Sequence, residues 1–104
     1  MKLKKLEHIE DDIYSFRLSD RFGYLDFETN QEYFWILNIN VKEKHRGKGH
    51  ASNLLFEFFK HFNRDGVKID FGCFTDDGEK LIPVIKRLFN LYKNVISINN
   101  ENFK

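Results

Sequence analysis

The sequence KEKHRGKGHASNLL, residues 42 to 55, places a basic turn with two glycines directly before an apolar run. The residues before it, 33–41, are almost all apolar and predict a long strand. Those after it repeat apolar side chains at helical spacing, namely Ala51, Leu54, Leu55, Phe58 and Phe62. The stretch therefore predicts a strand, a tight turn and an amphipathic helix in immediate succession.

The remaining segments complete a prediction of the fold. Alternating patterns with turn residues between them predict strands at Ile13–Leu18, Phe22–Glu28, Tyr33–Val41, Val67–Phe74 and Val95–Ile98, with Leu3–Ile9 as an optional further strand. A second helix is expected from near Glu79 to Tyr92. The strand-helix-strand order after residue 33 favours a parallel pair with a right-handed crossover. We expect an α/β (α+β) class, with a mixed, mostly antiparallel central sheet and two main helices.

The third strand carries apolar residues on both of its faces. By the period of two, one face would hold Tyr33, Trp35, Leu37, Ile39 and Val41. The other face would hold Phe34 and Ile36 before Asn38 and Asn40 replace them. This pattern predicts a central strand that is covered on both sides and opens toward something polar near its end.

Length and composition limit the classes of protein. A chain of 104 residues with 41% hydrophobic residues and twelve Phe suits one folded domain, 1–104. A net charge of +1 gives no overall field for nucleic acid. Cys73 is the only cysteine, and the four histidines show no paired spacing with it, so we expect no metal. With no apolar run of membrane length and a charged start, the expected location is cytoplasmic, without a membrane partner.

The turn itself has the features of an anion site. A loop that opens a helix aims unpaired N–H groups at one place, and the helix dipole adds positive charge there. Gly47 and Gly49 allow the backbone angles and the close approach that such a site needs, while Arg46 and Lys48 add charge. Neither the Walker pattern nor the dinucleotide fingerprint fits the spacing. A solvated basic loop and a nucleic-acid contact through 42–50 remain as alternatives.

The turn resembles the acyl-CoA-binding signature of the GCN5-related N-acetyltransferases, Gln/Arg-x-x-Gly-x-Gly/Ala between a central strand and a helix. Counting to Gly47 and Gly49 puts Lys44 at the first position, and counting to Gly49 and Ala51 puts Arg46 there. The resemblance extends over roughly Ile13 to Ile98. It implies the acyl-CoA N-acyltransferase fold of this family. The family's usual N-terminal strand and two helices would be missing, as in a short minimal member truncated at the N-terminus.

The resemblance implies acetyl-CoA as co-substrate, with its pyrophosphate on the amides of 46–51 and its pantetheine arm along 39–41. The implied contacts are Ile39, Asn40, Val41, Lys44, Arg46, Gly47, Lys48, Gly49, His50 and Ala51. A backbone N–H on the strand would stabilise the oxyanion as a primary amine attacks directly. The amine would belong to a protein lysine, an N-terminus or a small molecule, and a homodimer is one option.

The proton carriers usual in that family are absent here. The glutamate on the central strand would fall within 35–38 and the tyrosine on the last helix near Ile85, and neither is present. Asn38, Glu28 and Tyr92 remain as catalytic candidates. The alternatives without a catalytic role are a polar residue at a strand end for Asn38, a solvated carboxylate for Glu28 and an aromatic packing residue for Tyr92. Cys73 is expected to be a buried structural thiol. The alternative function is an inactive CoA-binding or protein-interaction module. A nucleic-acid binder is disfavoured, because no aromatic residue interleaves with the basic loop.

Overall fold

The computed structural model describes residues 1–99 and 103. The strands and α-helices are β1 Lys2–Glu10, β2 Ile13–Ser19, β3 Gly23–Thr29, β4 Tyr33–Val41, α1 His50–Phe62, β5 Lys68–Asp70, α2 Ile82–Leu91 and β6 Ile96–Ser97. Short 3₁₀ turns at Glu43–His45 and Gly78–Leu81 precede the two helices. No helix in the described part of the chain is both long and apolar enough to cross a membrane.

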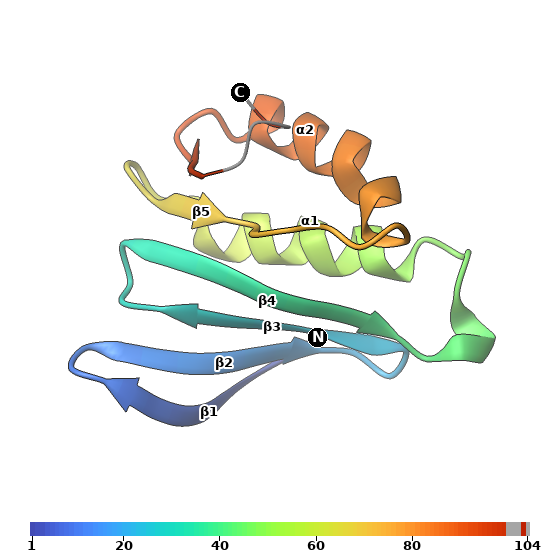
Figure 1. Ribbon diagram of the computed structural model, residues 1–104, viewed down its shortest axis with the longest axis horizontal. Coiled ribbons are helices and arrows are strands. Elements are labelled where there is room, and N and C mark those ends of the chain that lie inside the picture. Colours follow the sequence, from blue (N-terminus) through green and yellow to red (C-terminus); the bar gives the residue numbers. More distant parts are fainter. Residues whose placement is uncertain (100–102, 104) are drawn as a thin grey trace.

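The six strands form one sheet in chain order, from β1 to β6 (Figure 1). Neighbours are antiparallel from β1 to β4, whereas β4 with β5 and β5 with β6 are parallel. The two helices lie on the same face of the sheet, because α2 touches α1 directly: the rings of Phe59 and Phe89 are 5.1 Å apart. The predicted class, a mixed and mostly antiparallel sheet with two helices, is confirmed.

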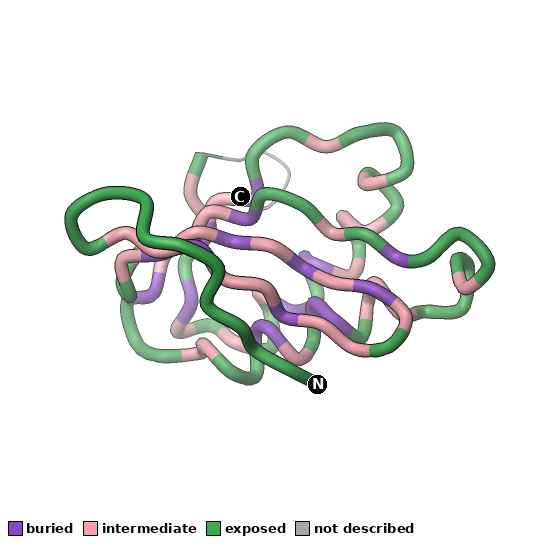
Figure 2. The backbone as a smooth tube through the Cα atoms, turned by 90° about the horizontal axis from the view of Figure 1, so that it is seen from below, coloured by how far each residue is buried: buried purple, intermediate pink, exposed green. Residues whose placement is uncertain are grey.

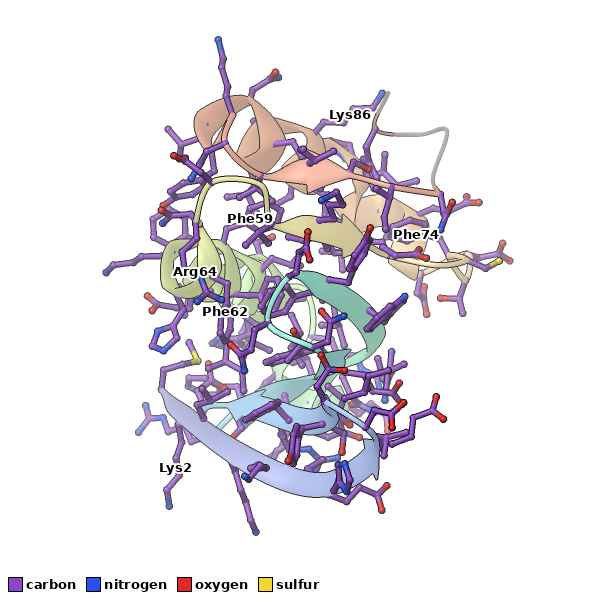
Figure 3. All side chains as sticks on the ribbon, turned by 90° about the vertical axis from the view of Figure 1, so that its left-hand side faces the viewer. Lys2, Phe59, Phe62, Arg64, Phe74 and Lys86 are labelled. Carbon is purple, nitrogen blue, oxygen red and sulfur yellow. The ribbon has the colours of Figure 1, made fainter. Side chains whose placement is uncertain are left out.

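Aromatic rings fill the space between α1 and the sheet. Phe58 is fully buried, and its ring lies 5.1 Å from Phe27 and 5.6 Å from Phe34. Phe62 contacts the same two strand residues at 5.4 Å and 4.8 Å. Figure 3 shows the side chains of Phe59 and Phe62 extending from α1 into the body of the protein. This cluster fixes the position of α1 and therefore of the turn that precedes it.

A bulge in β4 corrects the predicted faces of this strand. Phe27 pairs with Ile36 but Asp26 pairs with Asn38, so Leu37 is an extra residue without a partner on β3. After the bulge the alternation is reversed. Ile39 therefore shares the buried face with Ile36, and Leu37 is 56% exposed.

The bulge also moves the asparagines. Asn38 and Asn40 share the outer face with their β3 partners Asp26 and Tyr24, opposite to the predicted face. Both are exposed, and Trp35 on the same face is only half buried. Within the described residues this outer face has no helix on it, so the prediction of cover on both sides is also wrong.

The structure also differs from two further strand predictions, for β5 and for the N-terminal strand. β5 ends at Asp70, not at Phe74, because Gly72 adopts φ +64° and turns the chain out of the sheet. The optional first strand is present as β1, so an N-terminal strand is not missing. It joins β2 through a turn at residues 11 and 12, with no helix between them.

Candidate functional site

A cleft of about 630 Å³ opens where β4 and β5 separate. The two strands pair only from Tyr33–Trp35 to Lys68–Asp70. Beyond this point residues 36–41 of β4 form one wall, and residues from 71 to 81 form the other. The basic turn and the start of α1 close one end, through His45, Arg46, Gly47, Gly49, His50, Ala51 and Ser52.

The glycines of the turn adopt conformations that other residues avoid. Gly47 has φ +78° and Gly49 has φ +83°, both in the left-handed region. A Cβ atom at either position would have no heavy atom within 4 Å in the described structure. Backbone angle, not crowding by the protein, therefore demands glycine here. The space beside both residues is open to a ligand.

Backbone N–H groups without a protein acceptor gather in this turn. The N–H groups of His45 and Arg46 donate to the carbonyls of Lys42 and Glu43, at 2.8 Å and 3.3 Å. The first helical bond of α1 runs from Asn53 to the carbonyl of Gly49, at 3.0 Å. The six N–H groups from 47 to 52 therefore have no acceptor among the described residues. They lie at the positive end of the α1 dipole.

The basic residues of the turn are not equivalent. Arg46 lines the cleft, and its Nε donates to the carbonyl of Val41 at 2.9 Å, so one side of its guanidinium is anchored to β4. Its own backbone N–H is already used, as described above. Lys44 and Lys48 are exposed and do not line the cleft. The other predicted contacts line it: Ile39, Asn40, Val41, Gly47, Gly49, His50 and Ala51.

Two histidines pack against Phe22 beside the turn, His50 stacked on its ring and His45 edge-on to it. The ring of Phe22, from the connection between β2 and β3, lies 3.7 Å from His50 and 4.9 Å from His45. Burial and the nearby charge of Lys48 lower the pKa of His45, with His50 adding to the effect. The charged form of His45 is therefore less favoured than in a free histidine. No sequence pattern linked Phe22 to this site, because the contact joins separate connections of the sheet.

The structure brings only one of the three catalytic candidates into the cleft. Asn38 lines it. Glu28 lies on β3, across from Trp35, and is not a lining residue. Tyr92 ends α2, and its ring packs 6.1 Å from that of Phe59, which supports the plain reading of Tyr92 as a packing residue.

The second wall of the cleft contains residues that sequence reasoning did not assign. Cys73 is exposed and lines the cleft, so the expectation of a buried thiol is wrong. Asp77 is the only carboxylate among the described lining residues, and its Oδ1 lies 3.6 Å from Nζ of Lys80. The chain here is irregular, so its apolar residues show no helix or strand periodicity from which these positions could have been predicted. Within residues 1–99 and 103, no three His, Cys, Asp or Glu side chains gather as metal ligands would.

Comparisons with known proteins give one likeness. No family model matches the chain, and no curated protein matches it. Among solved structures, GCN5 from Tetrahymena is similar over 76% of this chain and 51% of its own, with 14% sequence identity and a TM-score of 0.48. The chain thus spans about half the length of that structure.

Proposed function

We propose that the protein binds acetyl-CoA in the cleft between β4 and β5 and transfers the acetyl group to a primary amine. One observation carries this proposal: the turn at one end of the cleft holds six consecutive N–H groups that lack acceptors among the described residues, at the start of α1. A pyrophosphate is an anion with several acceptor oxygens, and it suits such a set of donors.

The rest of the cleft fits the other part of the molecule. Apolar residues from both walls, among them Ile39, Phe71 and Leu81, suit the thin pantetheine arm. In the part of the chain that the structure describes, residues 36–41 of β4 have no partner strand on the cleft side. Their backbone groups can therefore pair with the amides of that arm as a strand would. A volume of about 630 Å³ lies within the range of ordinary ligand sites.

Acetyl transfer can proceed mainly with backbone groups and needs few side chains. The amine nitrogen attacks the thioester carbonyl carbon, the oxyanion accepts a hydrogen bond from a β4 N–H, and the carbon–sulfur bond then breaks. Thiolate and ammonium exchange a proton with the medium or a neighbouring group. Because Glu28 and Tyr92 lie outside the cleft, we propose that the amine arrives already deprotonated and that Asn38 hydrogen-bonds to it. The rate should then rise with pH up to the pKa of the acceptor amine.

A protein lysine or N-terminus is the acceptor class that we favour. The outer face beside the cleft is open, since Asn38 and Asn40 are exposed and no helix in the described structure covers them. An open face can admit a protein segment, whereas small amines are usually bound in closed pockets.

A second candidate function is binding of CoA without catalysis, and one observation favours it. The single lining carboxylate, Asp77, is exposed and lies near Lys80, and it offers no poised base. A module that binds CoA without catalysis would have the same cleft. Transfer to an amine separates the two functions, because only the enzyme makes acetylated product.

Thermal melting with and without acetyl-CoA tests binding. At about 100 times the dissociation constant, a ligand stabilises the folded state by about 2.7 kcal/mol. For a domain of this size that raises Tm by roughly ten degrees or more. No shift at millimolar acetyl-CoA would overturn the proposal. Binding of DNA or RNA that weakens steeply with salt would instead support the nucleic-acid alternative.

Mass spectrometry of candidate peptides tests transfer. The expected product is heavier by one acetyl group, and its formation requires the protein. A thiol-reactive dye is unsuitable for measuring released CoA unless Cys73 is first replaced, because this thiol is exposed. Binding without transfer to any of a broad set of lysine and N-terminal peptides would favour the non-catalytic module.

A further inference from the structure

A row of facing residues crosses the outer face of the sheet, on which no helix of the described structure lies. Glu7 lies opposite Ser15, and Ser15 lies opposite Glu28. Glu28 in turn lies opposite Trp35. The row begins on β1, which Figure 2 shows as a continuous green tube leading from the N-terminus, and ends on β4 beside the cleft. Since facing residues have Cβ atoms about 5 Å apart, one small group can contact Glu7, Ser15 and Glu28 together.

A bulge in β1 brings one of the two carboxylates into this row. Lys5 pairs with Phe16 and Glu7 pairs with Ser15, so Leu6 is an extra residue on β1. Regular pairing would place Leu6, not Glu7, opposite Ser15. Bulges often redirect a side chain in this way. The bulge therefore places an acidic residue, in place of an apolar one, beside the serine.

The hydroxyl group of Ser15 is nearly buried and has no partner. It points to the outer face, because the next residue, Phe16, stacks on Phe27 at the helix side. Ser15 is 6% exposed, and its Oγ forms no hydrogen bond with a described residue. Among the described residues, only Ser97 has a side-chain oxygen that is both unpartnered and closed to solvent, so the Oγ of Ser15 still reaches the surface. Nearly buried polar groups normally have partners, so this one indicates a polar ligand.

The two glutamates of the row have no cationic partner in the described structure. The one cation of β2, Arg17, is engaged elsewhere: its Nε and Nη2 donate to both carboxylate oxygens of Asp26, at 2.7 Å and 2.9 Å. Lys4 of β1 lies opposite Arg17, not opposite a carboxylate. Glu28 is half-buried, so it is only partly solvated. The row thus lacks positive charge that a ligand could supply.

An ammonium group is the ligand that suits these three residues. It carries one positive charge and three N–H donors, and two carboxylates and a hydroxyl offer one acceptor for each donor. The half-buried ring of Trp35, next in the row, adds the attraction of an aromatic face for a cation. A metal ion is a poorer match, because no three His, Cys, Asp or Glu side chains of the described residues gather as ligands.

We propose that Glu7, Ser15 and Glu28, here called the Ser15 site, bind the side-chain ammonium of a lysine in an acceptor protein. A second amine of the same segment then reaches the cleft. Binding of the lysine stands by itself, whereas its role in choosing the acceptor rests on the proposed function.

The position of the Ser15 site relative to the cleft sets the spacing of the two amines. Asn38 lines the cleft, and it lies two strands from Ser15 and two residues along the sheet, as counted on β3 from Glu28 to Asp26. With strands about 4.8 Å apart and a rise of about 3.4 Å per residue, the separation is about 12 Å. An extended segment covers this distance in about three or four residues.

Exposed leucines on both sides favour a protein segment over a free polyamine. Leu6, beside Glu7, is 44% exposed, and Leu37, beside Asn38, is 56% exposed. A peptide has side chains that can cover these apolar surfaces, whereas a polyamine has none.

Trp35 provides a direct measurement of binding, because it is the only tryptophan and lies in the row. The probe is a ten-residue peptide of Gly and Ser with blocked ends and two lysines four positions apart, titrated at 0.15 M salt without acetyl-CoA. Its control is the same peptide with both lysines acetylated. We expect the lysine peptide to change the fluorescence saturably and the acetylated peptide to leave it unchanged. No saturable change at about 5 mM lysine peptide, equal effects of both peptides, or equally tight binding of spermidine would overturn the proposal.

Variants locate the binding. Glu28→Gln should weaken it about ten-fold or more, and Ser15→Ala about five-fold, as expected for a charged and a neutral hydrogen bond. Glu57→Gln is the matched control, because Glu57 is also half-buried but lies on α1, and it should bind like the wild type. A cooperative thermal melt shows that each variant is folded. Equal weakening by Glu28→Gln and Glu57→Gln would mean general attraction of charge and would overturn the site.

The spacing is tested by acetylation. Among peptides with lysines from one to six positions apart, those with spacings of three or four should be acetylated fastest, and equal rates at all spacings would overturn the role in choosing the acceptor. The two proposals fail separately. A melting shift with acetyl-CoA but no binding of the lysine peptide overturns the Ser15 site alone. Binding of the peptide without any effect of acetyl-CoA upholds the Ser15 site and overturns the proposed function.

Discussion

A carboxylate placed in the glycine turn should abolish binding of acetyl-CoA, while the same change at a distant glycine should not. Gly49→Asp is the test variant and Gly66→Asp is its control. Gly49 has φ +83° and Gly66 has φ +81°, and neither would have a heavy atom within 4 Å of an added Cβ. Both variants therefore add the same charge and nearly the same backbone strain. Only Gly49 lines the cleft.

The expected effect follows from Coulomb's law. A carboxylate about 5 Å from one phosphate charge costs roughly 3 kcal/mol at an effective dielectric constant of about 20. That is a factor of roughly one hundred in Kd. Forcing a side chain into the left-handed region costs about 1–2 kcal/mol in folding free energy. This cost is common to both variants and lowers Tm by roughly 4–8 °C per kcal/mol.

Isothermal titration calorimetry at 0.15 M salt, with parallel thermal melts, measures both quantities. We expect Gly66→Asp to bind acetyl-CoA like the wild type, despite its lower Tm, and Gly49→Asp to lose binding. Equal affinity of the two variants would refute the assignment of the anion site to the turn. Loss of binding in both would show that stability, not the carboxylate, decides the result.

Three further predictions concern the fold and His45. Gly23→Ala should cost about 2–3 kcal/mol in urea unfolding, because its Cβ would lie 2.2 Å from the backbone oxygen of Asn40; an unchanged midpoint would contradict this. Phe58→Ala should cost about 3–5 kcal/mol since the side chain is fully buried, and a loss below about 1 kcal/mol would count against the aromatic core. His45 should titrate in NMR below its ordinary pKa of 6.5, and Lys48→Ala should raise that midpoint. Because folding lowers this pKa, His45 should make the protein less stable as pH falls below 6.5, not as it rises.

The turn and the helix behind it were predictable because their signals are local. Two glycines, a basic run and apolar residues at helical spacing all lie within 42–62, and the helix is found at His50–Phe62 where it was expected. Glycine at positions 47 and 49 permits the left-handed φ angles that both residues adopt. These local signals could be interpreted without knowing which strands pair.

The bulge in β4 depends on pairing between strands, which a period of two cannot reveal. Leu25 and Phe27 on β3 must face Ile39 and Ile36 on β4, and only an extra residue at Leu37 allows this. The spacing of three between Ile36 and Ile39 is the one sequence signal that could have shown it. Both asparagines changed face as a result.

The second wall of the cleft was the least predictable part of the site. Residues 71–77 were expected to continue a strand and then turn, but Gly72 diverts the chain and exposes Cys73. Irregular segments take their shape from what they pack against, here Phe71 on the aromatic core. The extent of the domain, the residues that contact a ligand and the catalytic side chains stay predictions.

The order of strands in the sheet has a consequence for how the chain folds. Each strand pairs with the next one along the chain. The hairpins from β1 to β4 close short loops, whereas pairing of β4 with β5 must enclose the whole of α1 and therefore costs more entropy. We expect the meander to form early and the β4–β5 pair to form late, so that amide hydrogen exchange is faster at Lys68–Asp70 than in β2 and β3. The cleft thus lies between a part of the protein that folds early and a part that folds late. Its two walls can therefore separate without unfolding of either part.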